Sequence, residues 1–181
     1  TLTINSNTTG TVDNPYRGTI RLSSGIMEVN TDAPWTLPAQ GPPGGIPPVP
    51  KGTLVLDSSK TGHEPTLRGQ KLILEGLLGA TGGVSYVEAA LDTMPSGEIN
   101  VFTNSDLLLQ GATNYNGGNI HGGGKLWQAG DATVTGNTTI NTTYMDWDGD
   151  EANPSDTTIN PGVIFTIQSE SIEADPLVEG H

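Results

Sequence analysis

The chain has 181 residues, enough for one domain, and its 20 acidic against 7 basic residues give a formal net charge of −13. It contains no cysteine, which excludes disulfides, thiolate metal sites and a thiol nucleophile. The 25 glycines and 13 prolines favour short strands joined by many turns, and no apolar run approaches the roughly 20 residues of a membrane-spanning helix.

The negative charge is concentrated towards the C-terminus. Lys125 is the last basic residue, and the segment 126–181 contains ten acids, so it carries −10 of the total charge of −13. A field of this sign repels phosphate backbones and predicts no nucleic-acid partner. It would attract cations or basic surfaces, and the alternative is that the acids keep a weakly charged surface soluble.

The first residues, Thr1 to Ile4, already alternate as a strand does, without an initiator Met or a signal segment. We therefore expect residues 1–181 to form a single segment of a longer, processed chain.

A short phrase recurs along the chain: a glycine, often a polar residue, then a few residues of apolar or alternating strand. The irregular spacing of the copies predicts coils of roughly 20 to 30 residues with loops of variable length between them. Stacked coils of this kind form an all-β parallel β-solenoid, and the alternative architecture is a β-sandwich with jelly-roll connections. The copies begin at Gly18, Gly52, Gly69, Gly97, Gly124 and, more loosely, Gly162.

Seven prolines fall between Pro34 and Pro50. Proline cannot donate to a strand ladder, so the segment 34–50 predicts an extended loop that projects from the body of the protein. Trp35 lies in this segment and is a candidate for contact with a partner through an exposed ring. Trp127, which follows Leu126 within a strand phrase, is instead expected to pack in the core or in a stack of side chains.

Two later segments differ in their periodicity. Val84 to Leu91 is the one stretch with plausible helical spacing, and it would form at most two turns. Ala132 to Tyr144 gives the clearest strand signal, with Val134, Ile140 and Tyr144 on the apolar face. A run this long predicts a bend near Gly136-Asn137. The residues expected on its outer face include Thr133, Thr139 and Asn141.

An acidic cluster follows this strand and is the most ion-like feature of the sequence. Calcium takes about six to eight oxygen ligands, and alternate carboxylates on an extended loop can converge on one ion. The spacing departs from the EF-hand pattern, so a calcium site and a solvated turn both stay open. Trp147, inside the cluster, is the second candidate for contact with a partner. The candidate ligands are Asp146, Asp148, Asp150 and Asp156.

No catalytic site is predicted. His63, His121 and His181 lie far apart in the sequence and outside any metal or triad signature. Paired carboxylates for glycoside hydrolysis can be assembled from any of the 20 acids, which leaves that assignment without specificity.

Two segments, Thr135–Asn141 (TGNTTIN) and Thr157–Val163 (TTINPGV), resemble the T-G-x-T-x-I-N-x-G-hydrophobic phrase of the autotransporter-associated β-strand repeats. These repeats occur in β-helical passengers and other large bacterial surface proteins. The first copy lacks the closing glycine, and the second lacks the opening Thr-Gly. The resemblance implies a right-handed parallel β-helix that is exported and extends from a cell surface, and it carries over no catalytic residues.

The sequence therefore predicts a structural or adhesive element of a bacterial extracellular protein, without catalytic activity and with no cofactor other than the candidate calcium. Expected partners are cell-surface or matrix components, including glycans, and neighbouring copies or neighbouring segments of the parent chain. The alternatives are a carbohydrate-binding module and a polysaccharide-degrading β-helix enzyme.

Overall fold

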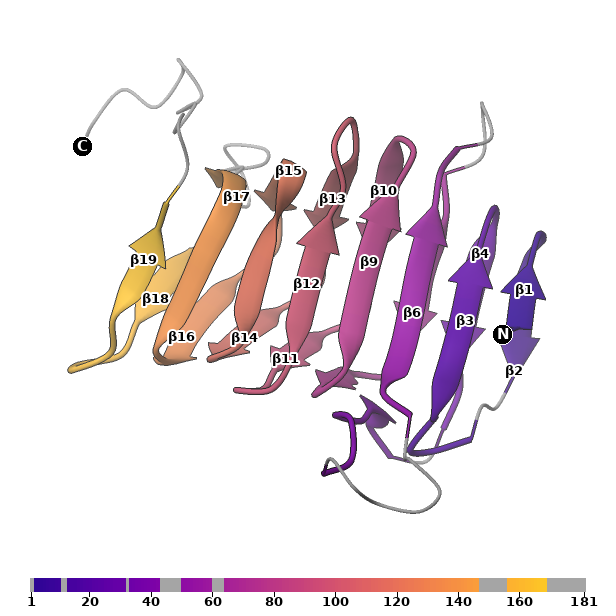
Figure 1. Cartoon of the computed structure of the whole chain (residues 1–181), viewed down its shortest axis with the longest axis horizontal. Helices are drawn as coiled ribbons and strands as arrows, with labels where there is room; N and C mark the ends of the chain where they lie inside the picture. The colour runs from indigo at the N-terminus through magenta and orange to yellow at the C-terminus, as the bar shows by residue number, and fades with distance from the viewer. Residues whose placement is uncertain are drawn as a thin grey trace.

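The chain forms an all-β parallel β-solenoid of about six turns (Figure 1). This computed structural model describes residues 2–10, 13–31, 33–42, 50–59, 64–146 and 156–168. The described residues form strands and turns and contain no helix, so no helix among them could cross a membrane.

Strands of successive turns pair in parallel and form three rows along the long axis of the solenoid (Figure 1). The first row contains β1 (Leu2–Ile4), β3 (Gly18–Leu22), β6 (Gly52–Asp57), β9 (Leu77–Thr81), β12 (Glu98–Val101) and β19 (Phe165–Ile167). The second contains β2 (Thr8–Gly10), β4 (Ile26–Val29), β7 (Thr66–Gly69), β10 (Val84–Val87) and β13 (Asp106–Leu109). The third contains β5 (Trp35–Leu37), β8 (Leu72–Leu74), β11 (Leu91–Thr93), β14 (Thr113–Asn116), β16 (Ala132–Gly136) and β18 (Thr157–Ile159).

Two long strands join the first and second rows. β15 (Asn119–Gln128) pairs with β12 through its first residues and with β13 through its last residues. β17 (Thr138–Asp146) follows β15 along both arms, with a shift of register between them. Each strand therefore turns a corner of the coil without a separate loop.

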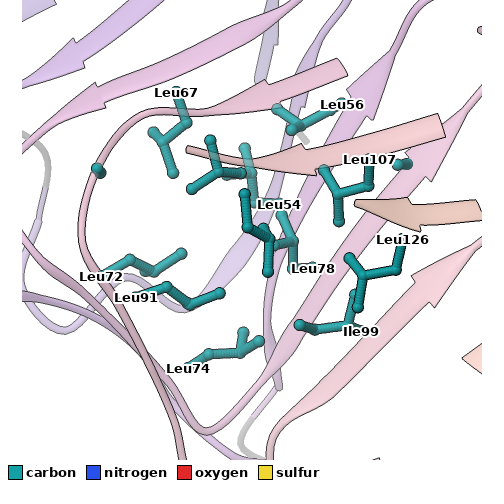
Figure 2. Packing of buried hydrophobic residues seen from close by; sticks show 14 of the residues in the cluster. Leu54, Leu56, Leu67, Leu72, Leu74, Leu78, Leu91, Ile99, Leu107 and Leu126 are labelled. Atoms are coloured by element: carbon teal, nitrogen blue, oxygen red, sulfur yellow. The ribbon is translucent and has the colours of Figure 1, made fainter. Parts of the chain in front are cut away.

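Side chains at equivalent register positions stack on one another inside the coil. In the first row this produces an aliphatic ladder whose members between the two ends are at most 1% exposed. Leucines from the other two rows point towards the same interior, so the three rows enclose a single apolar core (Figure 2). The members of the ladder are Leu2, Ile20, Leu54, Leu78, Ile99, Ile120, Ile140 and Ile167.

Glycine is required where a corner of one turn lies directly on the corner of the turn before it. A Cβ atom on Gly76 would lie 2.1 Å from the carbonyl oxygen of Gly52, and one on Gly97 would lie 2.2 Å from that of Leu74. Side chains do not fit at these distances, so the recurring glycines allow the turns to stack closely.

The predicted parallel solenoid is confirmed, and the jelly-roll alternative is wrong because the strand pairs are parallel. The predicted bend is also confirmed, since β16 ends at Gly136 and β17 begins at Thr138. Ile140 is fully buried, whereas Thr139 is exposed, as the alternation predicts. The right-handed sense of the coil stays a prediction.

The expectation of a helical turn at Val84 to Leu91 is wrong. The chain forms β10 up to Val87, turns at residues 88–90 and enters β11 at Leu91. Val87 and Leu91 are both buried because they face the interior from different rows, and the corner between them imitates helical spacing.

The proline-rich segment 34–50 is partly a strand, which corrects the predicted loop. Pro34 and Pro38 flank β5 instead of interrupting it, so the strand keeps its donors. The backbone N–H of Trp35 donates to the carbonyl of Lys71 at 2.8 Å. Residues 43–49 lie outside the described part of the chain.

Candidate functional site

The outer face of the first row carries a polar cluster of Lys51, Glu98 and His121. Lys51 immediately precedes β6, Glu98 opens β12 and His121 lies on β15, so three turns contribute. The Lys51 ammonium donates to Oε2 of Glu98, and Nε2 of His121 lies 2.9 Å from Oε1 of the same carboxylate. The three side chains are 28–30% exposed. Both oxygens of Glu98 are therefore occupied.

The hydrogen bond from Lys51, and after it the one with His121, holds the pKa of Glu98 below its ordinary value. The carboxylate is thus ionised at neutral pH and is a poor proton donor. Among the described residues no three His, Asp or Glu side chains lie close enough together to hold a metal ion. The cluster therefore fits a role in holding stacked turns together better than a role in acid–base or metal chemistry.

Other ion pairs also join one turn to another. Arg21 on β3 binds Asp57 at the end of β6, where partial burial opposes ionisation but hydrogen bonds from Ser59 and Arg21 keep the pKa of Asp57 below its ordinary value. Arg68 pairs with Glu88 at 2.6 Å in the second row. Lys71 pairs with Asp92 at 3.1 Å in the third row. Arg21, Arg68 and Lys71 are thus each paired with a carboxylate of another turn.

A shallow open groove of about 320 Å³ lies where β15 and β17 turn from the first row to the second. The Thr142 hydroxyl donates to the carbonyl of Gly124 at 2.8 Å and holds the two bends together. The walls offer amide and hydroxyl groups and carry no charged side chain, so the groove could accept a neutral polar group. It is lined by Gly122, Gly123, Gly124, Asn141, Thr142, Thr143 and Gln168.

Four large side chains stack at one register position on the outer face of the second row of strands. We call this stack the outer apolar stripe, and its members are Tyr86, Leu108, Trp127 and Met145. Of the two packings expected for Trp127, the stack is confirmed, because it lies between Leu108 and Met145 at the same register position, and the core is not, because Leu126 and Gln128 on either side of it are the fully buried residues. Leu108 and Met145 are 8% exposed, and Tyr86 and Trp127 are half-buried. Burial and the neighbouring Glu64 raise the pKa of Tyr86.

The predicted calcium ligands are not brought together by the described structure. Asp148 and Asp150 lie outside the described residues, as does the side chain of Asp146 at the end of β17. Asp156 is exposed, and its backbone N–H donates to Oδ1 of Asp131 at 3.3 Å. Calcium binding by this cluster stays a prediction.

Of the two predicted partner contacts, Trp147 lies outside the described residues, and Trp35 is fully buried. The Trp35 ring stacks above Leu72 at the same register position, and its indole N–H donates to the carbonyl of Asp13 at 3.3 Å. An exposed contact through Trp35 is inconsistent with this position.

No family model matches the chain, and neither the curated proteins nor the solved structures include a significant match. The resemblance to autotransporter-associated repeats therefore remains a likeness of two short segments. Assignment of a function depends on the geometry of the chain itself.

Proposed function

We propose that this chain is a structural or adhesive element of a bacterial extracellular protein, a rod that presents its outer faces and has no catalytic activity. The observation that carries the proposal is the aliphatic ladder, whose members from Ile20 to Ile140 are almost completely buried. Each turn packs only against its neighbours, so such a core lengthens by adding turns and holds surface side chains in fixed register.

The arrangement of charges supports the same proposal. The described ion pairs connect turns, and the Glu98 carboxylate is saturated by Lys51 and His121. The likeness of Thr135–Asn141 and Thr157–Val163 to repeats of bacterial surface proteins supports a location at the cell surface, with cell-surface or matrix components as partners.

A carbohydrate-binding module is the second candidate, and the groove beside Asn141 favours it. Side-chain amides such as those of Asn141 and Gln168 both donate and accept hydrogen bonds, which is the pattern that sugar hydroxyls require. A glycan array with the wild-type chain and an Asn141→Ala variant tests this candidate. Thr139→Ala, a change at an exposed position on the same strand outside the groove, is the matched control.

Two measurements test the structural proposal. Labelling of intact cells of the source organism with a membrane-impermeant reagent should modify the protein, and incubation with plant, algal and bacterial polysaccharides should release no reducing ends. Reproducible cleavage that disappears on replacing a single Asp or Glu would overturn the proposal in favour of an enzyme. Loss of array binding in Asn141→Ala alone would favour the carbohydrate-binding module.

A further inference from the structure

One register position on the outer face of the first row changes from apolar to polar along the solenoid. Strand pairing places Val55, Gly79, Asn100, His121 and Asn141 at this position, and we call this set the outer column. Its strands β6, β9, β12, β15 and β17 lie side by side (Figure 1). Neighbouring strands are about 4.8 Å apart, so the part of the column from Gly79 to Asn141 is about 14 Å long.

An aromatic ring lies at the apolar end of the outer column. Phe102 directly follows β12 and is 47% exposed. A Cβ atom on Gly79 would lie 3.8 Å from a ring carbon of Phe102 and 3.8 Å from a methyl carbon of Val55. The ring thus lies over the position that Gly79 leaves without a side chain. An exposed aromatic ring offers a flat apolar surface, and the C–H face of a pyranose sugar fits such a surface.

The polar part of the outer column keeps hydrogen-bonding groups that the fold does not use. Within the described part of the chain, the side-chain amides of Asn100 and Asn141 form no hydrogen bond. His121 lies between them and is held by its contact of 2.9 Å with Glu98. A side-chain amide both donates and accepts, so Asn100 and Asn141 can bind hydroxyl groups on either side of His121.

The outer column continues into the open groove, because Asn141 also lines that groove. The glycines 122–124 lie between the turn that holds Phe102 and the turn that holds Asn141, and a Cβ atom on Gly124 would lie 2.4 Å from the carbonyl oxygen of Phe102. The surface between Phe102 and Asn141 therefore carries no side chain at this corner. It is open to a ligand that contacts both residues.

We propose that the outer column and the adjoining groove bind a linear, neutral oligosaccharide that runs along the axis of the solenoid. One sugar stacks on Phe102, and hydroxyl groups of the following sugars bond to the amides of Asn100 and Asn141. The groove has no charged side chain, and the net charge of −13 repels acidic glycans. This inference rests on the adhesive part of the proposed function and names the class of its partner.

Isothermal titration calorimetry of the full chain with neutral cello-, malto- and xylo-oligosaccharides tests the inference. The affinity should rise from the monosaccharide to oligomers that span the column and then level off. Phe102→Ala should weaken binding about tenfold through the lost ring contact. Asn100→Ala and Asn141→Ala should each weaken it about two- to tenfold.

Two variants outside the outer column are the matched controls and should bind as the wild type does. Ile164→Ala truncates another exposed apolar side chain, and Asn30→Ala removes another exposed amide. Phe102→Leu keeps an apolar side chain over Gly79 but removes the ring, so it should bind almost as weakly as Phe102→Ala. Circular dichroism checks that every variant keeps its strands.

The outcomes separate this inference from the proposed function. Loss of binding in Asn141→Ala with no effect of Phe102→Ala would confine the sugar to the groove and overturn the extended site. Equal affinity for monosaccharide and oligomer, or tighter binding of oligogalacturonate than of any neutral oligomer, would also overturn it. A chain that binds none of these sugars, but is labelled on intact cells and cleaves no polysaccharide, would overturn this inference alone and leave the structural function intact.

Discussion

The Tyr115 hydroxyl donates a hydrogen bond of 2.7 Å to Oε1 of Gln128 in the interior of the coil, where both side chains are fully buried. Gln128 occupies a position that Val87 and Leu109 fill in the preceding turns. Its amide nitrogen donates to the carbonyl of Gly130 at 2.6 Å. A polar residue thus continues an apolar ladder because both ends of its amide are satisfied.

Tyr115→Phe should destabilise the protein by about 1–3 kcal/mol, since Gln128 Oε1 loses its donor while it stays buried. Urea unfolding followed by circular dichroism measures the change in free energy. Tyr86→Phe, on the outer face, is the control and should cost less. Adding Gln128→Met to Tyr115→Phe removes the unsatisfied oxygen and should recover part of the loss. Equal costs for the two tyrosine variants would contradict the assigned role of the buried pair.

Ile140→Asp should destabilise by more than about 4 kcal/mol, because it places an unpaired carboxylate in the aliphatic ladder. Thr139→Asp introduces the same side chain at the exposed neighbouring position and should change the free energy of unfolding by less than about 1 kcal/mol. Similar unfolding midpoints for these two variants would mean that the facing of β17 is wrong.

Local periodicity predicted the inward positions of β16 and β17 because alternation within a strand needs no knowledge of its neighbours. Val134 and Ile140 face the core as expected. The same alternation places Trp127 on the outer face, because its neighbours Leu126 and Gln128 are the fully buried residues. The burial of Trp35 could not be predicted in this way, because the three-residue strand between Pro34 and Pro38 is too short to show an alternation.

The Lys51, Glu98 and His121 cluster could not be predicted in the same way. His121 pairs in register with Asn100 and not with Glu98. That register depends on the number of residues in each turn, which varies along the chain. Lys51 is separated from both by a further turn. Alternation places each side chain on an outer face, but only the stacking of turns brings the three together.

Gly76→Ala should destabilise by about 1–3 kcal/mol, because its Cβ would overlap the backbone carbonyl of Gly52 and force the turns apart. Gly10→Ala is the matched control, since a Cβ there meets no atom within 4 Å. Thermal unfolding compares the two variants. A melting temperature for Gly76→Ala at or above that of Gly10→Ala would show that the corners do not limit the packing of turns.

Calcium in millimolar excess should leave the melting temperature unchanged relative to chelator if the acidic cluster is a solvated turn. A calcium ion that binds only the folded chain would instead raise the melting temperature. The rise would grow with the logarithm of the ratio of the calcium concentration to the dissociation constant. Scanning calorimetry decides between the two interpretations. A rise that Asp148→Asn abolishes would establish the predicted site.

Glu98→Gln should change how stability responds to acid. The pKa of Glu98 lies below its ordinary value of 4.5 in the folded protein, so its ionised form stabilises the fold above that pH. This contribution is lost as the pH falls through the folded pKa, because the protonated carboxyl gives up its charge-assisted bonds to Lys51 and His121. At neutral pH the wild type should be more stable than Glu98→Gln by about 1 kcal/mol or less, since the pair is partly exposed to solvent. This difference in stability should shrink on acidification.

Glu75→Gln is the control, because Glu75 is a half-buried carboxylate without an ion pair among the described residues. Its difference from the wild type at neutral pH should be smaller. Urea unfolding at a series of pH values gives both curves, and a Glu98→Gln difference that is constant across the acid range would show that the carboxylate does not fasten these turns.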